Sequence, residues 1–227
     1  MGDTTTVMQR KGLPDLADAF DLDLVALDQL PESDYTVITD EDFHWPNGFA
    51  VPNMLLDAEC VIQTCCLKTH RYGGHFTMSL KNSVGLVPGA PSASGFSGSY
   101  NYMLDLYGSP HQRLMIAEIN TAYQPALIVM GGVEAFIQGG PTTGTWAQTG
   151  VMLAGTDRVA LDAVGVAILR MFGTTPEVSQ GRIFEQDQIA RAVELGLGVD
   201  APEKIDFITD DAESEAYAKE IRRTLNA

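Results

Sequence analysis

Segments with the length and composition of β-strands alternate with segments of helical spacing along most of this 227-residue chain. Strands are predicted at 23–28, 35–40, 60–67, 125–132, 151–157 and 204–210. Helices are predicted at 13–20, 53–58, 75–86, 109–123, 157–173, 186–198 and from 211 to the end. Because such alternation is typical of βαβ units, we expect an α/β fold with a mainly parallel sheet and helices on both of its faces. Residues 1–227 are expected to form a single domain.

Two glycine-rich stretches interrupt this pattern. Residues 87–102 and 136–150 are predicted to be long loops at one edge of the sheet. Long loops inside compact domains often cover a binding site, and we expect this role for both. For 87–102 the alternative is a disordered excursion.

The charge balance excludes some classes of partner. The chain has 14 Lys and Arg against 30 Asp and Glu, a formal net charge of −16. A protein that binds nucleic acid through its phosphates needs clusters of basic residues, so we expect no nucleic-acid partner. Anionic membranes are disfavoured for the same reason, and no apolar run reaches the ~18 residues of a membrane span.

The cysteines indicate a reducing compartment. Cys60, Cys65 and Cys66 are too few and too closely spaced for a disulfide framework. No Cys-x-x-Cys spacing is present, so we expect no iron–sulfur cluster and no zinc knuckle in this chain. The amino terminus has no apolar signal core, and we therefore expect a cytoplasmic protein.

The scarce basic residues gather in one stretch, 65–82. Between residues 12 and 112 the basic residues are Lys68, Arg71 and Lys81, and His70 and His75 lie among them. This stretch is predicted to run from a strand end through a loop into a helix, where ligands bind in open α/β sheets. We predict that Lys68 and Lys81 bind an anionic group, since Lys is a good point charge for phosphate or carboxylate. The alternative is that both lysines balance surface carboxylates.

The histidines admit two interpretations. His70 and His75 are predicted to act as acid and base, or to bind a divalent metal together with His111. Asp157 or Asp162 could add a carboxylate ligand, although the spacing matches no known zinc signature. The alternative for each histidine is a hydrogen-bonded structural role.

Two aspartates begin the predicted helix 157–173. Asp157 follows a strand and is expected to cap the helix. Asp162 lies in an apolar run, so a semi-buried carboxylate there needs a partner. We expect that partner to be a cation of the 65–82 stretch.

The motifs resemble those of the DUF362 family. They are Lys-Thr-His at 68–70, Thr-x-x-x-Lys-Asn-x-x-Gly at 77–85, Gly-Pro at 140–141 and Asp-x-x-Ala-x-Asp at 157–162, and the resemblance covers about 57–172. It adds ligand-binding candidates beside His75 and Asp157, namely Thr69, Thr77, Asn82, Gly140 and Pro141. Many members carry a fused ferredoxin-type segment, which implies redox association and a ferredoxin-type partner.

The chain departs from the family pattern in three places. It lacks the cysteines of the fused ferredoxin-type segment, so the iron–sulfur cluster is not inherited. Members usually begin with a further strand and a Lys-Pro-Asn element, so we expect a truncated start or a short variant. Gly131 stands where members have Asp in an Asp-Gly-Ile element, so one candidate site carboxylate is missing.

The function predicted from these features is a small-molecule or cofactor-binding enzyme with redox or proton-transfer chemistry. Its catalytic residues would be Lys68, His70, Lys81 and Asp162. One alternative is a non-catalytic cofactor carrier or a module that docks an electron-transfer partner, with Lys68 and His70 on a broad exposed surface. The other is a degenerate family member that keeps the fold without the site.

Overall fold

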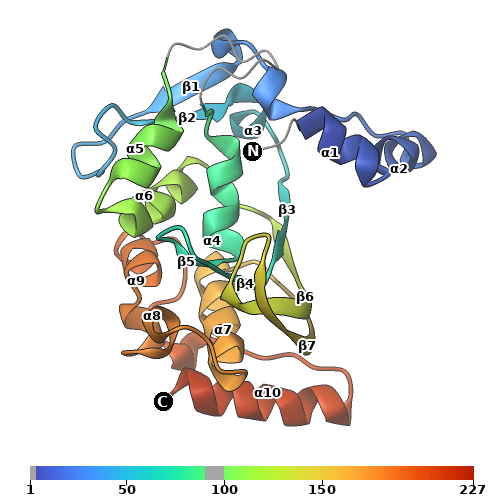
Figure 1. Cartoon of the computed structure of the whole chain (residues 1–227), viewed down its shortest axis with the longest axis vertical. Helices are drawn as coiled ribbons and strands as arrows, with labels where there is room; N and C mark the ends of the chain where they lie inside the picture. The colour runs from blue at the N-terminus through green and yellow to red at the C-terminus, as the bar shows by residue number, and fades with distance from the viewer. Residues whose placement is uncertain (1–3, 90–99) are drawn as a thin grey trace.

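The computed structural model describes residues 4–89 and 100–227, which form three small sheets packed together with helices (Figure 1). β1 (Tyr35–Ile38) pairs with β2 (Phe49–Pro52), and β4 (Lys68–His70) pairs with β5 (His75–Thr77), both antiparallel. β3 (Ile62–Cys66) runs parallel to β6 (Leu127–Gly139), which pairs antiparallel with β7 (Gly144–Gly155). The fold is therefore α/β as expected, but the predicted mainly parallel sheet is wrong, because antiparallel pairs predominate among the described strands.

The helices lie between and around these sheets. They are α1 (Thr4–Arg10), α2 (Leu13–Phe20), α3 (Asn53–Leu56), α4 (Ser79–Asn82), α5 (Tyr102–Gly108), α6 (Gln112–Ile119), α7 (Arg158–Met171), α8 (Pro176–Ser179), α9 (Asp187–Glu194) and α10 (Ala212–Leu225). Short 3₁₀ turns include Ser83–Leu86, which continues α4. Within the described residues, no helix has the length and apolar character needed to cross a membrane.

A long hairpin replaces one predicted loop. β6 and β7 extend through most of 136–150, and the chain turns between Gly139 and Gly144. Gly140 has a φ of +71°, and a Cβ there would lie 2.3 Å from the carbonyl oxygen of Thr69. Only glycine lets this turn pack so closely on β4. The other predicted glycine-rich loop lies mostly at 90–99, outside the described residues.

Two predicted strands are absent from the described structure. Residues 23–28 and 204–210 form no ladder, and Ile208 is 95% exposed. Apolar residues alone do not make a strand, because a strand needs a neighbour for its backbone hydrogen bonds. The predicted strands at 35–40, 60–67, 125–132 and 151–157 correspond to β1, β3, β6 and β7.

The central stretch contains a hairpin that the sequence did not indicate. The predicted loop after β3 forms β4 and β5, and the helix predicted at 75–86 begins only at Ser79. Residues 75–77 pair with β4 as a strand, and Phe76 of this strand is fully buried. The helix therefore starts after β5.

The α7 helix forms the centre of the core. Eleven of its fourteen residues are buried, and it packs against α4, α10 and β7. Gly165 allows the chain before α4 to come close, since a Cβ there would lie 2.4 Å from the Sδ atom of Met78. Helix α7 thus fixes the segment that carries Lys81.

Candidate functional site

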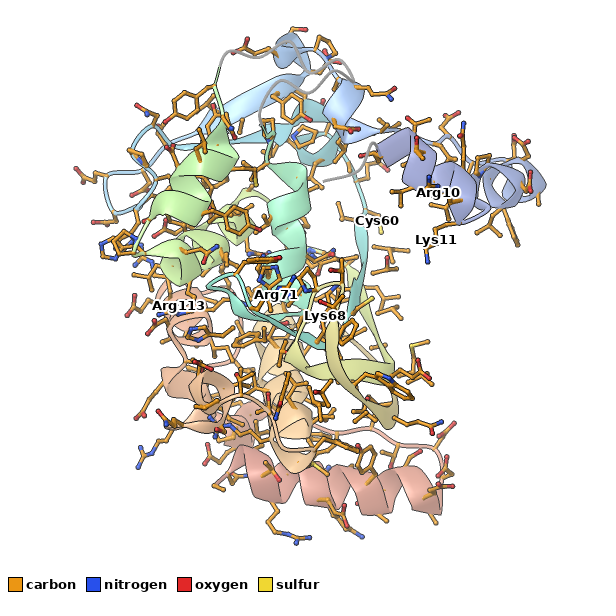
Figure 2. The ribbon with its side chains drawn as sticks, in the orientation of Figure 1. Arg10, Lys11, Cys60, Lys68, Arg71 and Arg113 are labelled. Carbon is orange, nitrogen blue, oxygen red and sulfur yellow. The ribbon has the colours of Figure 1, made fainter. Side chains whose placement is uncertain are left out.

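The hairpin β4–β5 and the short helix α4 bring the central basic residues together. Lys68 lies opposite Thr77 and His70 lies opposite His75 in the hairpin register. Figure 2 shows Lys68 and Arg71 in the middle of the molecule, near β4. The ion pairs of the described residues include none with Lys68, Arg71 or Lys81. Within the described part of the chain, these three cations therefore have no carboxylate within ion-pair distance.

Lys81 is the most unusual of the three. It is only 5% exposed, and no hydrogen-bond acceptor for its ammonium group is found in the described part of the chain. Its Nζ atom lies over the ring of Tyr107, 5.6 Å from the centroid. Burial first, and repulsion by Lys68 second, lower the Lys81 pKa from 10.5 to about 8. Lys81 is thus a desolvated amine with a partly exposed tyrosine ring as its neighbour.

Asp162 holds the helix that carries Lys81. Its carboxylate is fully buried and accepts hydrogen bonds from the backbone amides of Ser79 (2.7 Å) and Leu80 (3.1 Å). These bonds satisfy the first amides of α4. Burial raises the Asp162 pKa to about 7, against the opposing effect of the two amides. The expectation that Asp162 pairs with a cation of the central stretch is therefore wrong: its bonded partners are backbone amides, and it positions α4.

A buried polar network supports the other side of α4. The Asn120 side chain donates to the carbonyl oxygen of Leu80 (3.0 Å), and its Oδ1 accepts from Ser83 (2.7 Å) and from Arg158 (2.6 Å). Arg158 is fully buried. Sequence reasoning missed this network, although Arg158 directly after a capping aspartate in an apolar helix was a signal for it.

His70 is buried and neutral at physiological pH. Its Nδ1 atom accepts the backbone N–H of Tyr72 (3.3 Å), so the ring proton resides on Nε2. Burial, Lys81, Lys68 and Arg71, in that order, lower the His70 pKa to about 4. Nε2 has no hydrogen-bond partner among the described residues and can donate to a ligand.

A pocket of about 370 Å³ lies beside His70, between the β4–β5 hairpin and the α8 region. It is lined by Thr69, His70, Arg71, Gly73, His75, Gly139, Thr175 and Glu177. Arg71, Thr175 and Glu177 were not predicted. Lys68 and Lys81 are not among the residues that line this pocket.

His70 and His75 lie opposite each other and both line the pocket, but with His111 they form no three-ligand metal site in the described residues. The Nε2 atom of His75 lies 3.3 Å from Arg113, and burial followed by this guanidinium lowers the His75 pKa. His111 stacks on His44 with ring centroids 4.7 Å apart. Residues 4–89 and 100–227 contain no set of three or more His, Cys, Asp or Glu that could hold a metal ion.

The remaining candidates divide into structural and unpartnered residues. The Thr69 hydroxyl donates to the Phe136 carbonyl (3.0 Å). Asp157 caps α7 through the amide of Ala160 (2.8 Å), as expected, and also accepts from Val199 (2.8 Å). Gly140 and Pro141 form the turn packed on β4, and Asn82 is exposed.

Thr77 differs from these structural residues. Its hydroxyl is buried without a partner among the described residues, opposite Lys68.

Comparison with known proteins identifies the family of this chain. The model of the family described as a domain of unknown function, DUF362, matches residues 1–167. No match was found among curated proteins or among solved structures. The matched region ends within α7, so the pocket residues Thr175 and Glu177 lie outside it.

Proposed function

Since this chain belongs to the DUF362 family, whose function is unknown, we propose a function from the site itself. The protein binds a small anionic molecule at the cluster of Lys68, His70 and Lys81, here called the lysine–histidine cluster, and transfers a proton through Lys81. It is an enzyme in this proposal.

The observation that carries the proposal is a lysine side chain, Lys81, that is only 5% exposed and has no carboxylate partner among the described residues. Exposed Lys204, by contrast, lies 2.7 Å from Asp200. Burying an unpaired charge costs several kcal/mol unless a partner arrives, and strongly perturbed groups gather at functional sites. In a chain with 30 acidic residues, the absence of a counterion for Lys81 within the described residues favours a ligand as its partner.

The surrounding groups favour proton transfer. With a pKa of about 8, Lys81 exchanges its proton readily near neutral pH. The neutral His70 offers Nε2–H as a hydrogen-bond donor, and the hydroxyl of Thr77 has no other partner among the described residues. A bound anion would relieve the repulsion between Lys68 and Lys81.

Burial also favours this proposal over the docking alternative. A module that presents Lys68 and His70 to a protein partner needs both on a broad exposed surface, whereas His70 is only 7% exposed. Redox chemistry, a metal and a ferredoxin-type partner stay predictions.

The test is the pH dependence of lysine labelling by an amine-reactive reagent, read by peptide mass spectrometry. We expect the labelling rate of Lys81 to have its pH midpoint near 8. Inorganic phosphate or malonate should raise this midpoint and should also slow the labelling of Lys81. Lys68→Met should also raise the midpoint, since it removes a neighbouring cation. Lys219, whose side chain is 67% exposed, is the internal control. A Lys81 midpoint near 10.5, or equal protection of Lys81 and Lys219, contradicts the proposal.

A further inference from the structure

The side-chain stem of Lys81 packs closely against Gly74. A Cβ on Gly74 would lie 2.5 Å from the Cε atom of Lys81 and 3.6 Å from the Nδ1 atom of His70. The lysine stem therefore runs tightly across the Gly74 backbone, next to His70. On its other side the nitrogen faces the ring of Tyr107, which is 44% exposed. The stem of Lys81 is therefore packed, and its nitrogen lies beside a ring that is partly exposed.

The lone pair of that amine is free when Lys81 is neutral. No carboxylate, hydroxyl or carbonyl of the described residues is hydrogen-bonded to Nζ. Lysines become nucleophiles when they are desolvated beside a second cation, and Lys68 supplies that cation. These are the conditions for attack on a carbonyl carbon.

The neighbours of Lys81 match the two functional groups of a 2-oxo acid. Lys68 offers a charge for the carboxylate. His70, neutral and with Nε2–H unpartnered among the described residues, offers a donor to the carbonyl oxygen, and neutral imidazole can polarise a carbonyl in this way.

We propose that Lys81 forms an imine with a small 2-oxo acid at the lysine–histidine cluster, an inference that rests on the proposed function. The neutral nitrogen attacks the carbonyl carbon, a C–N bond forms, and the C=O π electrons move to the oxygen. That oxygen gains a proton from solvent and the nitrogen loses one. A second proton on the oxygen makes it a leaving group. The C–O bond breaks, water departs, and the nitrogen lone pair forms the C=N bond. Amine and carbonyl thus give imine and water without an oxidant or reductant. The iminium then withdraws electrons from the neighbouring carbon and makes its proton removable.

The chain suits a direct trapping experiment because it has five lysines, at 11, 68, 81, 204 and 219. The full-length protein is incubated with pyruvate and sodium cyanoborohydride near pH 8, and the reduced adduct is located by peptide mass spectrometry. We expect the adduct on Lys81, formed at least about tenfold faster than on Lys219, because the Lys81 pKa is lowered to about 8 and its stem is packed against Gly74. Lys81→Met should remove this adduct and Lys219→Met should leave it.

A matched glycine pair tests the geometry without removing the lysine. In Gly74→Ala the new methyl displaces the Lys81 stem, so trapping on Lys81 should slow by about tenfold. Gly85→Ala is the control, because a Cβ there has nothing within 4 Å. Melting curves confirm that each variant is folded.

The outcomes separate this inference from the proposed function. If malonate protects Lys81 but pyruvate adds equally to the exposed lysines or to none, the imine is overturned and the anion site stands. If malonate gives no protection either, both are overturned.

Discussion

At the scale of single residues, the cost of an unpaired charge marks the site. Sequence reasoning named Lys68, His70 and Lys81 because basic residues are scarce elsewhere, and the structure brings these three together. It could not show that Lys81 is buried, since Lys is mostly exposed in proteins and its neighbours in sequence give no sign of the contact with Gly74.

Replacing Lys81 should stabilise the protein. Lys81→Met keeps the length of the side chain and removes a desolvated charge, so we expect the free energy of unfolding at pH 7 to rise by about 1–3 kcal/mol. The change from 10.5 to about 8 in the pKa of Lys81 sets a ceiling of roughly 3 kcal/mol. Urea denaturation measures the difference.

The pH dependence of that gain has a definite sign. Because the Lys81 pKa is lowered on folding, the unfolded chain holds the proton more tightly between pH 8 and 10.5. The wild type should therefore become more stable through this window, and the advantage of Lys81→Met should shrink toward zero. A variant that is less stable than the wild type at pH 7 would show that the ammonium is well partnered.

At the scale of elements, Asp157, which caps α7, and Asp162, which lies within it, hold different segments of the chain. Asp157 and Asp162 each accept two backbone amides, but those of Asp162 belong to α4 while those of Asp157 lie at Ala160 and Val199. Asp162 therefore acts on the site by placing α4, and Asp157 does not touch it.

Asparagine at either position tests this division. Asp162→Asn and Asp157→Asn should each lower the free energy of unfolding by about 1–3 kcal/mol, since the amide nitrogen faces a backbone N–H. Only Asp162→Asn should change the pH midpoint of Lys81 labelling. If both variants change it, or neither does, then α4 is not held through Asp162 in the way the contacts indicate.

The same elements show which parts of the fold the sequence could predict. Helix 157–173 was predictable because its apolar spacing and its capping aspartate are local features. Two features could not be predicted, the pairing of β6 with β7 and the hairpin β4–β5. A strand depends on its partner strand and on tertiary contacts such as the close approach of Gly140 to Thr69. Glycines at 139, 140 and 144 indicated turns correctly but not the strands around them.

At the scale of the whole molecule, stability and the site depend on the carboxyl-terminal part. The family match covers 1–167, yet Ile168 and Leu169 of α7 are fully buried beyond it. The pocket also takes Thr175 and Glu177 from this later region. Features outside the family match therefore complete both the core and the pocket.

The two ends of the chain contribute unequally. Figure 1 shows α1 and α2 projecting from one side of the body, and Figure 2 places Arg10 and Lys11 on this arm. In the described structure α1 has no buried residue and α2 has only Ala17. Helix α10 instead packs on α7 and buries three apolar side chains, Ala218, Ile221 and Leu225.

Truncations should separate these ends. Deleting residues 1–22 should change the free energy of unfolding by less than about 1 kcal/mol, since little apolar area leaves the body. Deleting 212–227 should cost on the order of 5 kcal/mol, because apolar side chains of α10 and the facing surface of α7 become exposed. Chemical denaturation of both truncated proteins measures the difference, and equal losses would mean that the arm is packed on the body. Lysine labelling of the first truncation should still give the Lys81 midpoint of the full chain, because the arm supplies none of the residues that surround α4.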